Sequence, residues 1–231
     1  MASLADAGYE FAETEAGVLY PGLDDEAFGR ARRELLAEAL FPEVVRVPGL
    51  LTGTGGAEAD LSLRKACRRA ALVGAKVLVV TAPMDGADER HRVETWREAV
   101  QAVGSLGEHA ARNGLSVAVG PGGEGSVAET LEEAWVLAEE VGHRAVGVAG
   151  DLGAMGEAAD VAAAGSALRH VWMPLPRRYG GEAATTACLE TLGDLVELGY
   201  DGRVSVFAKW STFAERAGLL LDELKAYSKG R

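Results

Sequence analysis

Short apolar runs alternate along this chain with longer segments whose apolar residues recur at helical spacing. The run 77–80 is apolar at every position, as expected for a strand buried on both faces. In the segment 91–113, Val93, Trp96 and Val100 follow one another at spacings of three and four, which predicts one apolar helix face. Strands that alternate with helices in this way predict a parallel sheet with right-handed crossovers.

The pattern predicts seven strands, each followed by a helix. The strands are expected near 9–15, 43–50, 76–83, 116–121, 146–151, 168–174 and 203–208. The helices are expected near 24–40, 58–73, 91–113, 126–141, 156–166, 183–198 and 211–228. Ser126 and Glu129 have the spacing of a capping box, and Gly142 and Gly199 are typical of helix C-termini.

Composition narrows the class of protein. With 231 residues, 48% hydrophobic and 25% charged, the chain is expected to form one globular domain over 1–231. A net charge of −12 argues against a nucleic-acid partner. The sequence has no apolar run of about 18 residues and no signal-peptide pattern, so no membrane partner is expected. Cys67 and Cys188 are far apart and suit a reducing cytoplasm.

Four segments carry a resemblance to a known family, namely 7–13, 148–155, 170–172 and 199–206. Their order and spacing resemble the xylose isomerase-like TIM barrels of the sugar phosphate isomerase/epimerase superfamily, from residue 5 onward. The resemblance implies an α/β fold, a TIM-type (β/α) barrel whose site lies at the C-terminal ends of the strands. It also implies a small, sugar-like ligand.

The predicted strand count is one short of the eight strands of a TIM barrel. Residues 2–11 resemble the end of the family's first helix running into its second strand, so we expect the first strand to be absent and seven βα units to remain. Three explanations stay open: a real seven-stranded or open barrel, a start site placed too late, or a gap closed by a second subunit in a homodimer. Exposed strand edges are normally covered.

The resemblance further implies a divalent-cation site with most of its ligands missing. The family's Glu, Asp, His and Glu ligands fall at Gly120, Asp151, Trp172 and Phe207, so only Asp151 can donate. A substrate-contacting histidine of the family falls at Ala154. A hard cation needs several oxygen or imidazole ligands. We therefore expect no metal ion and no other cofactor.

The period-2 alternation of strands indicates which side chains could act in place of the missing metal ligands. If Trp172 and Phe207 face the interior, so do His170 and Lys209. We hypothesise that Asp151 orients His170, that His170 moves a proton, and that Lys209 holds an anionic or carbonyl oxygen.

Five positions are predicted to contact the ligand: Glu13, Arg46, Trp172, Arg178 and Phe207. Glu13 matches a family carboxylate, and Arg178 matches a family arginine that contacts substrate, with Arg177 as the neighbouring register. Trp172 and Phe207 have a second interpretation, in which they only fill the space of the missing ligands.

The other positions also have structural alternatives. Glu13 could serve only as an ion-pair partner of Arg46, and His170 as a core histidine bonded to Asp151 or to the backbone. Asp151 could cap the loop that follows it, and Lys209 could be solvated.

Two loops and three histidines complete the candidates. The glycine-rich segment 120–126 precedes a predicted helix and could bind an anion, and the segment 53–57 could form a lid. His91, His109 and His143 are predicted to be surface residues.

Three functions fit these observations. The first is a metal-independent isomerase or epimerase that moves protons on a sugar-like or polyoxygenated molecule. The second is a non-catalytic barrel that binds a small ligand or a partner protein. The third is a metalloenzyme completed by other carboxylates, such as Glu13 and Glu15.

Overall fold

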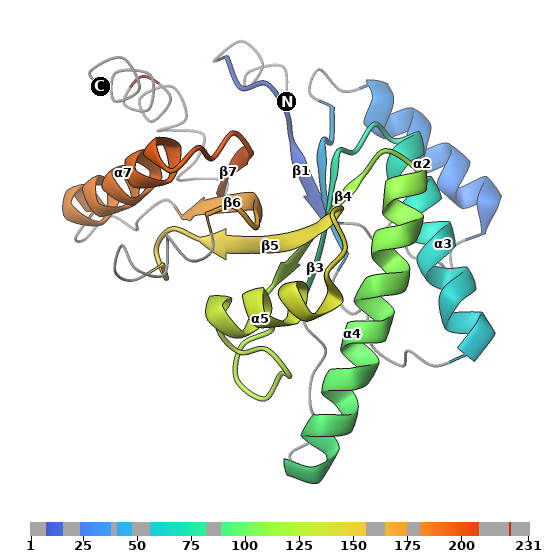
Figure 1. Cartoon of the computed structure of the whole chain (residues 1–231). Coiled ribbons are helices and arrows are strands. Elements are labelled where there is room, and N and C mark those ends of the chain that lie inside the picture. Colours follow the sequence, from blue (N-terminus) through green and yellow to red (C-terminus); the bar gives the residue numbers. More distant parts are fainter. Residues whose placement is uncertain are drawn as a thin grey trace.

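The architecture is a single parallel sheet of seven strands that curls into a nearly closed barrel (Figure 1). The computed structural model describes residues 8–15, 24–37, 41–47, 56–81, 89–155, 165–174, 181–207 and 222. The strands are β1 (Glu13–Glu15), β2 (Val44–Arg46), β3 (Val77–Thr81), β4 (Ser116–Gly120), β5 (Val146–Asp151), β6 (Leu168–Pro174) and β7 (Arg203–Phe207). They follow one another in chain order, and every neighbouring pair is parallel.

Helices cover the outside of the sheet, as Figure 1 shows. They are α2 (Asp25–Ala37), α3 (Gly56–Leu72), α4 (Glu89–Arg112), α5 (Leu131–Val141) and α7 (Gly181–Glu197). The predicted TIM-type barrel with seven strands is thereby confirmed for the described chain. The predicted helices near 156–166 and 211–228 lie almost wholly outside the described residues. None of the described helices is long and apolar enough to cross a membrane.

Alternate residues of the strands build two apolar layers. Outward-facing residues such as Leu78, Val119 and Val171 pack against the helices in the larger core. The smaller, inner cluster consists of Val44, Val77, Val79, Ala118 and Ala149, with Phe11 and Trp172 packed against it. Because successive side chains of a strand point to opposite faces, this division identifies the residues that face the barrel interior.

The helix predicted from residue 126 begins one turn later. Glu133 N–H donates to Thr130 Oγ1 at 3.2 Å, and Thr130 N–H donates to Glu133 Oε2 at 3.4 Å, which makes Thr130 the N-cap of α5. The Ser126 hydroxyl instead lies 2.7 Å from the Ala128 carbonyl oxygen. The Ser126 capping box was therefore wrong, because a second Thr/Glu pair at the same spacing follows it. Gly142 does end α5, in the left-handed conformation at φ 61°.

Gly147 on β5 is a position where a side chain cannot fit. A Cβ atom there would lie 2.0 Å from the Ala167 carbonyl oxygen, which belongs to the backbone. Gly147→Ala is expected to lower the free energy of unfolding by about 1–3 kcal/mol or more, because the backbone must shift. The matched control is Gly104→Ala in α4, where the nearest atom is Val141 Cγ1 at 3.9 Å. That change is expected to gain about 0.5–1 kcal/mol. Urea unfolding measures both, and an equal response would contradict the steric argument.

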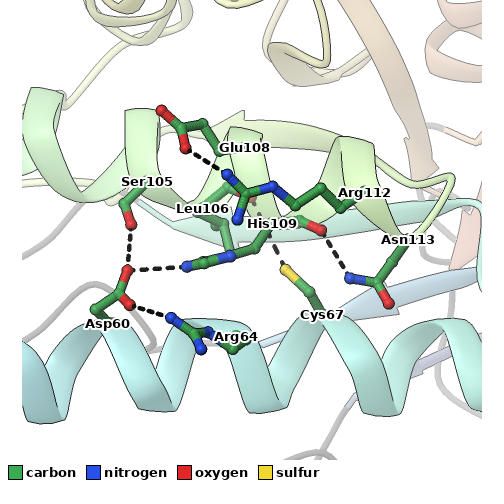
Figure 2. A network of polar contacts seen from close by, with 9 residues as sticks. All are labelled: Asp60, Arg64, Cys67, Ser105, Leu106, Glu108, His109, Arg112 and Asn113. Atoms are coloured by element: carbon green, nitrogen blue, oxygen red, sulfur yellow. Dashed lines mark hydrogen bonds and ion pairs between the residues drawn. The ribbon is translucent and has the colours of Figure 1, made fainter.

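A polar network joins α3 to α4 on the outside of the barrel (Figure 2). Asp60 Oδ1 accepts hydrogen bonds from Ser105 Oγ at 2.7 Å and from His109 Nε2 at 2.8 Å, and Asp60 Oδ2 accepts one from Arg64 at 3.0 Å. The His109 side chain is only 7% exposed. Its prediction as a surface residue was wrong, because it lies one turn after buried Leu106 on the helix face that packs against α3.

The other two histidines that were predicted to lie on the surface differ from His109. His143 is half-buried, and its Nδ1 accepts a hydrogen bond from the Ala145 N–H at 3.1 Å. The side chain of His91 lies outside the described residues.

The Asp60 network predicts a distinctive acid response. Hydrogen bonds from His109 and then Ser105 lower the pKa of Asp60 from 3.8 to about 2, against the opposing effect of desolvation. Since the folded pKa is depressed, the stabilisation is present above 3.8 and disappears as the pH falls through about 2. Asp60→Asn should therefore be less stable than wild type at neutral pH, and the difference should shrink on acidification.

Denaturant unfolding across this range measures the difference. Glu108→Gln is the control, because the ion pair of Glu108 with Arg112 is exposed and contributes little to stability. A gap between wild type and Asp60→Asn that stays constant with pH would contradict this account.

Candidate functional site in the barrel mouth

Glu13 is the centre of a polar cluster inside the C-terminal end of the barrel, here called the barrel mouth. His170 Nε2 lies 3.0 Å from Glu13 Oε2. The Trp172 indole N–H lies 3.1 Å from Oε1 and 3.0 Å from Oε2 of the same carboxylate. Arg46 Nε is 3.9 Å from Glu13 Oε1. One carboxylate on β1 thus joins side chains from β2 and from β6, across the barrel.

The alternation along β6 places His170 and Trp172 in this cluster. His170 and Trp172 face the interior, whereas Val171 and Met173 belong to the outer core. The rings of His170 and Trp172 meet edge to face, with centroids 5.4 Å apart and an interplanar angle of 88°. The prediction that these two side chains share the barrel mouth is borne out by their common contact with Glu13.

The surroundings of Glu13 keep its carboxylate ionised. Desolvation by itself would raise its pKa, but the hydrogen bond from His170, with contributions from Ser205 and Trp172, lowers the pKa below its usual 4.5. Ser205 is buried and pairs in register with Trp172. The Ser205 hydroxyl lies close enough to the Glu13 carboxylate to stabilise its anion. Within the described chain, however, Ser205 Oγ makes no hydrogen bond of good geometry.

Ser205 was not predicted as a site residue. The only available signal was its position two residues before Phe207, which gives it the same strand face.

His170 is fully buried, and only one of its ring nitrogens is satisfied. Its side chain is 0% exposed, and Nδ1 has no hydrogen-bond partner among the residues that the structure describes. We assign the neutral tautomer with the proton on Nε2, because the Glu13 carboxylate can only accept. Nδ1 then carries a lone pair in a dry environment. An unpaired buried nitrogen is costly to keep and is suited to accept a proton.

Asp151 does not orient His170, in contrast to the sequence-based hypothesis. Its Oδ1 accepts a hydrogen bond from the Gly153 N–H at 2.8 Å, so the side chain caps the turn after β5. The register explains the difference. Asp151 pairs with Trp172, whereas His170 pairs with Ala149. Asp151 therefore lies one layer further toward the C-terminal ends of the strands than His170. The structural alternative for Asp151, a loop cap, is the arrangement observed.

The remaining predicted positions are placed only in part. The backbone of Phe207 ends β7 in register with Pro174, two positions beyond the Trp172–Ser205 pair. Its side chain, and all of Arg178 and Lys209, lie outside the described residues. Their ligand-binding and catalytic roles therefore remain predictions.

The side chains that the structure describes at the barrel mouth do not offer a set of ligands for a divalent cation. A Cβ atom on Gly120 would lie 3.2 Å from Trp172 Cη2, so the indole occupies the space beside β4 where an acidic side chain would project. Indole has an N–H donor and no lone pair to offer a metal. Within the described ranges, no three His, Cys, Asp or Glu side chains gather as a metal-binding group.

Two carboxylates that follow the glycine-rich loop accept hydrogen bonds from backbone N–H groups in and after it. Glu129 Oε1 accepts a hydrogen bond from the Gly125 N–H at 3.1 Å. Glu133 Oε2 accepts one from the Glu129 N–H at 2.7 Å. These internal contacts occupy backbone donors that an anion would need, and they disfavour the predicted anion site. The segment 53–57 lies mostly outside the described residues.

Known structures share this architecture at low sequence identity. D-psicose 3-epimerase from Clostridium cellulolyticum H10, solved with D-tagatose, is 16% identical at a TM-score of 0.74, over 98% of this chain and 91% of its own. D-allulose 3-epimerase from Methylomonas sp. with D-allulose is 20% identical at a TM-score of 0.72, over 98% and 89%. The 3-keto-D-glucoside 4-epimerase YcjR from E. coli is 18% identical at a TM-score of 0.70, over 97% and 92%.

The family-level comparison is more specific than these likenesses. No curated protein matches the chain. The model of the xylose isomerase-like TIM barrel family matches residues 1–176, which is more than half of the sequence. The barrel and its strand order agree with this match. The chain belongs to the xylose isomerase-like TIM barrel family.

Proposed function

We propose that this protein is a metal-independent isomerase or epimerase that moves a proton on a sugar-like, polyoxygenated molecule. The observation that carries the proposal is the Glu13–His170 couple inside the barrel mouth, with His170 Nε2 3.0 Å from the carboxylate. A histidine oriented by a carboxylate through one ring nitrogen presents the other nitrogen for proton transfer. This couple replaces the Asp151–His170 pair expected from the sequence.

In this mechanism each residue has a distinct task. His170 Nδ1 accepts the proton from a carbon next to a carbonyl and forms an enediolate. It returns the proton to the other face of that carbon, or to the former carbonyl carbon once the neighbouring hydroxyl proton has moved to the former carbonyl oxygen. Glu13 fixes the ring and stabilises the imidazolium ion that forms in between. Arg46, whose side chain is 42% exposed, faces the developing negative charge on the carbonyl oxygen. Lys209 and Arg178 are proposed to hold further anionic or carbonyl oxygens of the ligand.

Access to His170 requires a change at Trp172. His170 is 0% exposed, and the edge of its ring contacts the indole. A ligand hydroxyl that donates to Glu13 would replace the indole N–H and compensate for its lost hydrogen bond. The freed indole face suits the C–H face of a sugar.

A second candidate function is a non-catalytic barrel that binds a small ligand or a partner protein. The full burial of His170 beneath Trp172 favours it, since a base needs contact with its substrate. The family match and the similar epimerase structures support a sugar-like ligand in either case.

One experiment separates the two candidates. Protein treated with chelator is incubated with ketohexoses, aldohexoses and their phosphates, and NMR follows both conversion and ligand binding. Conversion without added metal supports the isomerase or epimerase. Saturation-transfer binding without conversion supports the non-catalytic barrel. Conversion that appears only after a divalent cation is returned would contradict metal independence.

A further inference from the structure

Trp172 and Gly120 fit each other as one packing unit. Seen from Gly120, an added Cβ atom would meet Trp172 Cη2 at 3.2 Å and Cζ3 at 3.5 Å, with Val80 O at 3.8 Å. The indole can approach β4 this closely only because Gly120 has no side chain. A larger residue at 120 would therefore have to displace a ring that is already anchored elsewhere.

The anchor is on the opposite edge of the same indole. Trp172 Nε1 is 3.1 Å and 3.0 Å from the two oxygens of Glu13, a side chain that is only 17% exposed. The ring also contacts His170 edge to face. Displacing the indole would therefore remove donors from a largely buried anion, which raises the cost of any side chain at Gly120.

The charge of Glu13 is already compensated within the chain. His170, Trp172 and Arg46 surround it, and the pKa of Glu13 is lowered even though desolvation opposes ionisation. Asp151 Oδ1 is likewise engaged, by the Gly153 N–H. Hydrogen-bond donors therefore supply the stabilisation that a bound cation would otherwise give to carboxylates in a barrel mouth.

We infer that Gly120 and Trp172 form a coupled specificity pair that makes the barrel mouth exclude divalent cations and accept hydrogen-bond donors. Gly120 ends β4, Asp151 ends β5 and Trp172 lies on β6, so the two positions of the pair lie on the strands to either side of Asp151. A carboxylate at 120 and an imidazole at 172 would add two ligands for a divalent cation beside the carboxylate of Asp151. Neither change is expected to work alone, because the indole fills the space of the first.

The test compares Gly120→Glu, Trp172→His and the double variant by thermal unfolding with and without MnCl₂, in the absence of any sugar. Gly120→Glu alone is expected to lower Tm by several degrees. The double variant is expected to recover most of that loss, and its Tm alone should rise with Mn²⁺, since a ligand that binds the folded state stabilises it. Gly120→Ala in both backgrounds gives a milder version of the same test, in case Gly120→Glu fails to fold.

Two results would overturn the inference. One is additive Tm losses in the double variant, which would mean that the positions are independent. The other is a Mn²⁺-dependent rise in the Tm of the wild type that Asp151→Asn removes. The pair rests on the proposed function in one respect only, namely that the wild-type barrel mouth binds no metal ion. Because no sugar is present, a failure here is distinct from an absence of turnover.

Discussion

Glu13→Ala is expected to lower the free energy of unfolding by about 3 kcal/mol, the largest loss that we predict for a single polar side chain. The change leaves His170 Nε2 and the Trp172 indole N–H without their common acceptor in a buried environment. It also removes the carboxylate oxygen that lies 3.9 Å from Arg46 Nε. Urea unfolding measures the loss.

Two further variants sharpen this prediction. Glu10→Ala removes an exposed carboxylate three residues earlier and should change stability by no more than about 0.5 kcal/mol. Glu13→Gln keeps one acceptor oxygen and should fall between wild type and alanine. An equal response of Glu10 and Glu13 would contradict the central role of the Glu13 carboxylate.

The pH dependence of the Glu13 contribution has a definite sign. The folded pKa of Glu13 lies below 4.5, so its stabilisation is present above that value and decreases as the pH falls through the lowered pKa. The stability difference between wild type and Glu13→Gln should therefore narrow in acid. A difference that widens in acid would mean that Glu13 is protonated in the folded protein.

His170→Gln is expected to reduce kcat/KM for the sugar substrate by about 10²–10⁴-fold, the usual contribution of a general base. Glutamine can place a side-chain N–H near the position of His170 Nε2, so the bond to Glu13 and the fold should largely persist. It cannot supply the titratable lone pair of Nδ1. Steady-state kinetics measures the loss, with circular dichroism as the check on folding.

The matched control for this variant is His143→Gln. His143 is half-buried before β5, away from the Glu13 cluster, and its Nδ1 contacts the Ala145 N–H. Its replacement should leave kcat/KM unchanged. Full activity in His170→Gln would eliminate His170 as the proton carrier and return the choice to the non-catalytic barrel.

Local patterns in the sequence were sufficient to predict the parallel strands and the helices between them, and the family resemblance supplied the barrel. The apolar runs on β3 and β5 are buried on both faces, so their limits follow directly from hydrophobicity. The alternation along β6 also identified His170 and Trp172 as interior residues. Helix starts were less certain, because Ser126–Glu129 and Thr130–Glu133 offer the same capping spacing and only the second is used.

Contacts across the barrel could not be predicted in the same way. Glu13 and His170 are 157 residues apart in sequence, and their meeting depends on the curvature and register of all the strands between them. A shift in the β5–β6 register between Val148 and Ala149 places Asp151 beside Trp172, whereas the unshifted register would have placed it beside Val171. The apolar stripe of α4 likewise continues to His109, whose burial depends on Asp60 from another helix.

The most direct test of metal-independent proton transfer is solvent deuterium exchange. Chelator-treated protein is incubated in D₂O with D-allulose, D-tagatose and D-fructose, and deuterium incorporation at the carbons next to the carbonyl is measured by mass spectrometry. The account predicts incorporation that excess chelator does not diminish and that His170→Gln reduces by about 10²–10⁴-fold. Binding of these sugars without incorporation, or incorporation that chelator removes, would contradict it.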